Sequence, residues 1–150
     1  IGHVQSNKVK YMAPFVDLIH GVDRSKLLRE IDKQALKNNR IIDCLLQIHI
    51  AQESTKFGFS ESEITEALDL AGTLNNVRVV GLMGMATFTE NTQQITEEFK
   101  GLKRLFDQLK PQQPQFSVLS MGMSGDYPLA IAQGSNMIRV GSKIFGARNY

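Results

Sequence analysis

The sequence contains no tryptophan, one cysteine, four prolines and no long apolar run. The single cysteine, Cys44, excludes a disulfide framework within the chain and a zinc site built from clustered cysteines. It lies in the apolar run at residues 41–46, where a free thiol is expected to be a buried core residue. No stretch of about 18 apolar residues is present, so the sequence predicts no membrane-spanning helix. We find no signal-peptide pattern and expect a cytoplasmic location.

An excess of charge of either sign is also missing. The 150 residues include 17 basic and 15 acidic side chains, which leaves a net charge of +2. This balance gives no electrostatic reason to expect nucleic acid or a membrane surface as a partner. With 42% hydrophobic and 21% charged residues, the composition is that of an ordinary globular protein. We expect a single domain that spans residues 1–150.

Short apolar runs alternate with longer amphipathic segments. The runs are rich in Val, Ile and Leu, as is typical of strands that are covered on both faces in a parallel sheet. Strands are predicted at residues 1–4, 16–20, 43–50, 77–83, 116–121 and 137–140. Apolar positions spaced three and four residues apart predict helices at residues 25–38, 60–72, 91–110 and 128–133.

The strict alternation of strands and helices favours parallel strands joined by right-handed helical crossovers. Two architectures fit this order, an open doubly wound sheet and a closed (β/α)8 barrel. Periodicity alone does not distinguish them. Because residues 1–4 already have the pattern of a strand, and six strands are two fewer than a barrel needs, we expect an N-terminal part to be missing.

Two loops at predicted strand ends have the composition of an anion site. The loop at residues 120–126 combines Ser124 with glycines, which let a backbone approach a ligand closely. Backbone N–H groups at the start of the next helix would add donors. After the following strand, Gly141 and Ser142 offer a second pair of donors, and Arg139 places a cation in an otherwise apolar run. An ordinary capped turn and a salt bridge at the rim are the alternative interpretations.

Other polar residues give weaker signals. Lys56 follows a predicted strand, but its loop lacks a phosphate-loop spacing, and a solvated loop is the better interpretation. His3, His20 and His49 fall at or near strand ends. Their spacing is not that of a metal site, so capping and packing roles are favoured and no metal is expected.

Seven segments match the pattern of one family in order, at residues 1–8, 21–24, 56–58, 81–83, 119–126, 134–141 and 144–148. The Ser-Met-Gly-Met-Ser block at residues 120–124, together with the strand that carries Arg139, is the most specific part. On these residues the sequence resembles the pyridoxal phosphate homeostasis proteins, also called YggS-like or proline-synthase-associated proteins.

The resemblance implies the (β/α)8 barrel of the N-terminal part of alanine racemase, with pyridoxal 5′-phosphate (PLP) at the carboxyl ends of the strands. It implies that Met123 and Ser124 bind the phosphate and that Gly141 and Ser142 supply further donors. It also implies that Arg139 faces the pyridine nitrogen, where a second positive charge is disfavoured. The Schiff-base lysine of the family has no match in this chain, which corresponds to the last six strands of the barrel.

The function implied by the resemblance is PLP binding in PLP homeostasis, without a catalytic reaction of its own. PLP-dependent apo-enzymes are further candidate partners. One alternative is a PLP-dependent racemase-like enzyme, which would need acid–base residues on both faces of the ring, and for these only His3 is a candidate. Another is a barrel that binds a sugar phosphate. An incomplete barrel exposes two sheet edges, which promote association, and we expect a monomer or a weak dimer.

Overall fold

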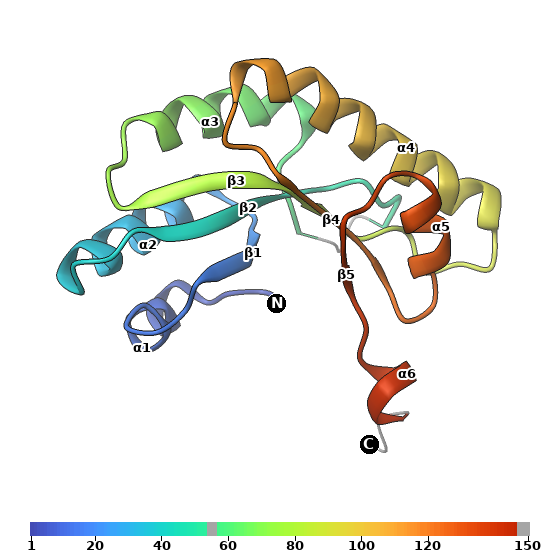
Figure 1. The fold of residues 1–150 in the computed structure, drawn as a ribbon, viewed down its shortest axis with the longest axis horizontal. Helices are drawn as coiled ribbons and strands as arrows, with labels where there is room; N and C mark the ends of the chain where they lie inside the picture. The colour runs from blue at the N-terminus through green and yellow to red at the C-terminus, as the bar shows by residue number, and fades with distance from the viewer. Residues whose placement is uncertain (54–56, 147–150) are drawn as a thin grey trace.

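The structure is a computed structural model that describes residues 1–53 and 57–146. In it, five strands form one parallel sheet in which neighbours follow chain order. The strands are β1 (Leu18–Val22), β2 (Ile42–Ile48), β3 (Val77–Gly84), β4 (Val118–Met123) and β5 (Met137–Arg139). A doubly wound sheet reverses its strand order at a switch point, whereas a barrel does not. The barrel-type fold is therefore confirmed, as a curled half-barrel with its helices on the convex side (Figure 1).

The helices begin and end close to where the sequence predicts. The longer ones are α2 (Ser25–Lys37), α3 (Ile64–Gly72), α4 (Thr92–Leu109) and α5 (Tyr127–Ala132). Shorter turns of helix are η1 (Ser6–Lys8), α1 (Val9–Met12), η2 (Glu61–Glu63), η3 (Lys110–Gln112) and α6 (Ser142–Phe145). Ser60 and Glu63 form a capping box, and the Asn91 side chain caps α4 by accepting a hydrogen bond from Gln94 N–H.

The predicted strand at residues 1–4 is wrong, because this segment pairs with no neighbouring strand. Gly2 has a φ of +101°, outside the extended region that a strand requires. Its carbonyl oxygen lies so close to β1 that a Cβ added to Gly21 would approach it to 2.5 Å. The Val4 carbonyl accepts a hydrogen bond from the Arg24 side chain at 3.0 Å. Side-chain contacts, and not a strand ladder, therefore hold the segment against the sheet.

Most of the core lies between the sheet and its helices. Leu28 and Ile31 of α2, Leu46 of β2, and Phe99 of α4 are fully buried there. Cys44 is buried in the same layer, which confirms its expected role as a core thiol, and burial raises its pKa.

The inner, concave face of the sheet has a smaller apolar cluster formed by Leu45, Val80 and Met83. Polar side chains occupy the same face nearer the carboxyl ends of the strands. These ends face the loops that follow β1 to β5, so the fold gathers those loops along one rim.

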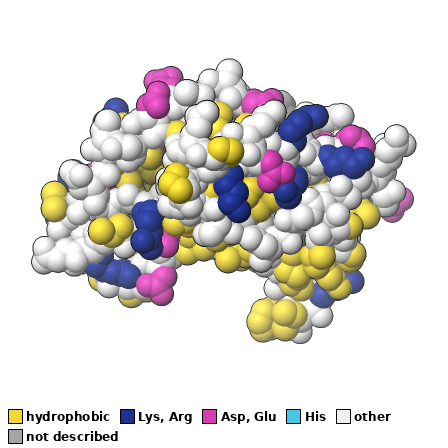
Figure 2. Space-filling view, turned by 45° about the horizontal axis from the view of Figure 1, so that its top comes forward, with side chains coloured by type: hydrophobic (Ala, Val, Ile, Leu, Met, Phe, Trp, Pro, Cys, Tyr) yellow, Lys and Arg dark blue, Asp and Glu magenta, His cyan; other side chains and the backbone are white. Residues whose placement is uncertain are grey.

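Charges of both signs are interspersed over the helix-covered face in Figure 2. Hydrophobic side chains gather at the protruding lower right of that view, where α6 lies, and its Ile144 and Phe145 are 68% and 86% exposed. Among the described residues, none of the helices combines the length and apolarity that crossing a membrane requires.

Candidate functional site

Ser124 joins the two loops that the sequence predicts to bind an anion. The strands β4 and β5 are neighbours, with Met123 opposite Arg139, so the loops that follow them meet at the rim. The Ser124 hydroxyl oxygen accepts hydrogen bonds from Gly141 N–H at 3.1 Å and from Lys143 N–H at 3.5 Å. Two backbone donors thus converge on one point, and the hydroxyl hydrogen of Ser124 remains available for a ligand. Ser142 lies beside these donors as the exposed first residue of α6.

The backbone N–H of Met123, which the sequence also assigns to the phosphate, has a partner within the loop. Its N–H donates to the Asp126 carboxylate at 2.6 Å, and its side chain is 42% exposed. Asp126 stands at the N-cap position of α5 but makes no side-chain capping bond to that helix. The structure therefore brings Ser124, Gly141 and Lys143 together, and leaves the Met123 amide with an acidic partner.

Arg139 lies on the inner face of the sheet and is only 6% exposed. Its Nη1 donates to the Ser120 hydroxyl at 2.6 Å, and its Nη2 donates to the Gly84 carbonyl at 2.9 Å. Burial lowers the pKa of Arg139 to about 10, partly offset by the Asp126 carboxylate, so the side chain is still a cation at neutral pH. These two bonds use two of the five N–H donors of a guanidinium. Its direct partners among the described residues are a hydroxyl and a carbonyl, which does not support a salt bridge at the rim.

Two residues of this inner face, His20 and Ser120, were not among the site residues that the sequence predicts. The Ser120 side chain is fully buried, and its Oγ lies 3.3 Å from His20 Nδ1. Burial, with a smaller contribution from Arg139, lowers the pKa of His20 to about 4. Residues two apart on a strand point to the same face of a sheet. His20 therefore shares a face with Leu18, and Ser120 shares a face with Val118, so alternation along the strands could have indicated both polar residues.

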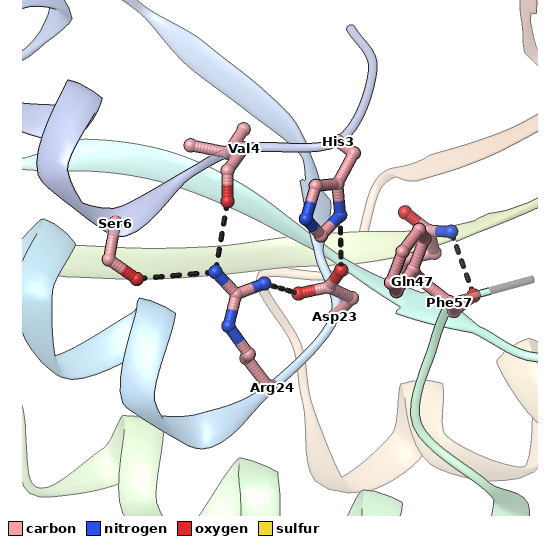
Figure 3. Close-up of polar contacts among 7 residues, drawn as sticks. All are labelled: His3, Val4, Ser6, Asp23, Arg24, Gln47 and Phe57. Atoms are coloured by element: carbon pink, nitrogen blue, oxygen red, sulfur yellow. Dashed lines mark hydrogen bonds and ion pairs between the residues drawn. The ribbon is translucent and has the colours of Figure 1, made fainter.

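A second polar cluster lies where β1 ends (Figure 3). The Asp23 carboxylate is buried, and its Oδ2 lies 2.9 Å from His3 Nδ1. Arg24 pairs with the other carboxylate oxygen and donates to the Val4 carbonyl and to Ser6 Oγ. The cluster therefore fixes the N-terminal segment to the end of β1.

The His3 ring also stacks on Phe57, with ring centroids 4.1 Å apart. Both residues border a cavity of about 440 Å³. His3 is thus an anchoring residue, in agreement with the packing role expected for it. No group of three metal-ligating side chains occurs within residues 1–53 and 57–146. Lys56 lies outside the described residues.

Comparison with known proteins places this geometry in a family context. The family model described as alanine racemase, N-terminal domain, matches residues 1–149. The pyridoxal phosphate homeostasis protein of Aquifex aeolicus is 40% identical, over all of this chain and 66% of its own length. Its counterpart from Escherichia coli K12 is 36% identical over all of this chain and 64% of its own length. The chain thus spans about two thirds of the length of these relatives, and the resemblance drawn from the sequence is confirmed.

Solved structures of related proteins have the same fold as this chain. PipY of Synechococcus elongatus, in a crystal structure with PLP bound, superposes with a TM-score of 0.86 at 32% identity, over 97% of this chain and 68% of that one. Alanine racemase of Clostridium difficile gives a TM-score of 0.71 at 12% identity, over 100% of this chain and 41% of the other. The second likeness concerns the fold alone, and it is the fold expected from the sequence.

Proposed function

The chain belongs to the alanine racemase N-terminal domain family, and from this premise we propose that it binds PLP and acts in cytoplasmic PLP homeostasis. The observation that carries the proposal is the convergence of the Gly141 and Lys143 N–H groups on Ser124. The buried cation Arg139 lies at the end of the neighbouring strand β5. It is supported by the 32% identity to PipY, whose structure has PLP bound.

The donors around Ser124 fit a phosphate ester. A phosphate oxygen needs hydrogen-bond donors, and this corner offers the Ser124 hydroxyl hydrogen and the nearby Lys143 side chain. The N–H groups of Gly141 and Lys143, which donate to Ser124 Oγ in this structure, would turn to the phosphate when it binds. The Lys143 ammonium lies 5.0 Å from the centre of the Tyr127 ring, so it is held over the same corner. The Asp126 carboxylate is already hydrogen-bonded to Met123 N–H. We assign phosphate binding to Ser124, Gly141 and Ser142, with Met123 lining the loop.

Arg139 is assigned to the ring nitrogen of PLP. PLP supplies an electron sink to enzymes that hold it, and this capacity is strongest when the ring nitrogen is protonated. A buried guanidinium beside that nitrogen disfavours a second positive charge there. A weaker electron sink suits racemase-like or non-catalytic chemistry. Because relatives are named pyridoxal phosphate homeostasis proteins, we propose a binding role without a catalytic reaction. None of the five strands contains a lysine, so the proposal concerns only non-covalent contacts.

Titration with PLP, followed by absorbance and by equilibrium dialysis, tests the proposal. The double variant Ser124→Ala/Arg139→Ala should bind PLP at least about tenfold more weakly, since it loses a phosphate contact and a charged contact. The matched control Ser117→Ala/Arg104→Ala alters exposed residues away from the rim and should bind as the parent does. Equal affinity in the two double variants removes Ser124 and Arg139 from the site. If glucose 6-phosphate displaces PLP at equal concentration, the site is a general sugar-phosphate site.

The role in homeostasis has its own test. The recipients that we propose are apo-enzymes that use PLP, so the loaded protein should restore activity to such an enzyme faster than its free PLP can. Incubation with L-alanine and PLP should produce no more D-alanine than PLP alone. Racemisation well above that background would overturn the non-catalytic part of the proposal.

A further inference from the structure

A chain of hydrogen bonds crosses the inner face of the half-barrel. It runs from the Gly84 carbonyl of β3 to Arg139 of β5, then to Ser120 of β4 and on to His20 of β1. His20 and Ser120 lie 100 residues apart in the sequence and on strands that are not neighbours. Their side chains meet only because the sheet curls, and Figure 1 shows that curled sheet.

One arrangement of donors and acceptors gives every group in this chain of bonds a partner. A guanidinium can only donate, so Ser120 Oγ is the acceptor of the 2.6 Å bond from Arg139. The single hydroxyl hydrogen of Ser120 is then left for His20 Nδ1, at 3.3 Å. If Ser120 Oγ accepted from Nδ1 as well, its own hydrogen would have no partner in this chain. The arrangement that uses every group therefore has His20 Nδ1 as the acceptor and the proton of the neutral ring on Nε2.

A protonated His20 would break this arrangement. Both ring nitrogens would then carry hydrogen, so Ser120 Oγ would accept from both sides and the Ser120 hydrogen would lose its acceptor in this chain. A second cation would also stand near the buried Arg139 guanidinium. The low pKa of His20, caused chiefly by burial, agrees with a ring that stays neutral.

We propose that His20 and Ser120 are positioning residues, which hold the Arg139 guanidinium so that its free N–H donors face the ring nitrogen of PLP. The proposal rests on the proposed function for the identity of the ligand. Arg139 has several rotatable bonds, and a guanidinium held in place before binding loses less conformational freedom when a ligand arrives. Gly84 fixes one nitrogen through the backbone, and Ser120 fixes the other through its side chain.

The first experiment needs no ligand. Two-bond ¹H–¹⁵N NMR spectra of the imidazole rings at pH 7 report which nitrogen of His20 carries the proton. We expect a bare Nδ1 and a protonated Nε2 in the parent protein, a mixture of tautomers in Ser120→Ala, and the parent tautomer in Ser120→Thr, which keeps the hydroxyl. A protonated Nδ1 in the parent, or a tautomer that Ser120→Ala leaves unchanged, would overturn the inference.

The second experiment measures PLP binding and the absorption maximum of bound PLP, which responds to protonation of the ring nitrogen. His20→Leu and Ser120→Ala should weaken binding about fivefold, the ratio that one ordinary hydrogen bond represents, and shift the maximum. His20→Asn places an acceptor near the former Nδ1, so it should bind within about twofold of the parent, with the parent spectrum. Circular dichroism checks that each variant is folded.

The outcomes separate the two proposals. If the parent binds no PLP, the proposed function fails, while the NMR result still decides whether the hydrogen-bond chain exists. If the parent binds PLP and His20→Leu binds equally well with an unchanged spectrum, the positioning role fails and the proposed function stands.

Discussion

Replacing Gly122 by alanine should destabilise the protein at the loop that carries Ser124. Gly122 has a φ of +101°, a conformation that residues with a side chain rarely adopt. An added Cβ would lie 2.7 Å from the Ala130 Cβ and 3.0 Å from the Tyr127 Cα. Neither atom can turn away by a change of rotamer, so α5 would have to move as a unit.

Two costs combine in this variant. A non-glycine residue at positive φ costs roughly 1–2 kcal/mol. Forcing a methyl group against a packed helix costs roughly 1–3 kcal/mol. We therefore expect the free energy of unfolding to fall by about 3 kcal/mol, a large part of the ~5–15 kcal/mol available to a domain. With a urea slope of roughly 2 kcal/mol/M, the midpoint should fall by about 1.5 M.

Gly125→Ala is the matched control, because Gly125 lies three residues further along, after β4 ends, without a positive φ, and an added Cβ would meet nothing within 4 Å. Its midpoint in urea, followed by circular dichroism at 222 nm, should stay within about 0.5 M of the parent. PLP affinity should fall in Gly122→Ala alone, since α5 packs beside the Ser124 loop. Equal stability of the two variants would refute the reasoning.

Three further predictions concern titration, the ion pairs at the end of β1, and the buried thiol. The pKa of His20 is 6.5 in the unfolded state and about 4 in the native state. Between these two pH values the unfolded state binds a proton that the native state does not bind. The free energy of unfolding should therefore be at its full value above pH 6.5 and should decline towards pH 4. Because the ring is partly exposed, solvent screening reduces this effect to about 1–2 kcal/mol. Urea titrations at pH 4.5 and 7.5 should show a smaller decline in His20→Asn than in the parent, and an equal decline contradicts the assignment. Asp23→Asn removes the charged partner of His3 and Arg24, so it should lower the free energy of unfolding in urea by about 2 kcal/mol. The control is Asp69→Asn at an exposed position. An equal loss in both variants would show that the cluster contributes little to stability. Since burial raises the pKa of the Cys44 thiol, iodoacetamide should label it slowly in the native protein and rapidly in urea; fast native labelling at neutral pH would contradict its burial.

Local sequence patterns were sufficient for much of the fold. Alternating apolar runs and amphipathic segments predict strands and helices, because burial on both faces of a strand, or on one face of a helix, selects those spacings. Ser60 and Glu63 mark a helix start through bonds that span only three residues. The Gly and Ser residues near Ser124 and Gly141 likewise indicate an anion site from composition alone. Such features depend on neighbours along the chain.

The strand predicted at residues 1–4 shows that local patterns do not predict which segments pair. A strand exists only if another strand supplies hydrogen bonds, and apolar spacing says nothing about a partner. In the structure, Val4 bonds to the Arg24 side chain instead. The choice between a doubly wound sheet and a barrel was open for the same reason, since it depends on the order in which strands pair.

The polar chain on the inner face was decided by tertiary structure alone. Arg139 was recognisable in the sequence as a cation within an apolar strand, yet its partners Ser120 and Gly84 come from two other strands. His20 reaches Ser120 across 100 residues, because five parallel strands in chain order twist and curl until the first approaches the fourth. The sequence by itself determined which residues could bind an anion. The curvature of the sheet, a property of all the strands together, decided which of them face one another.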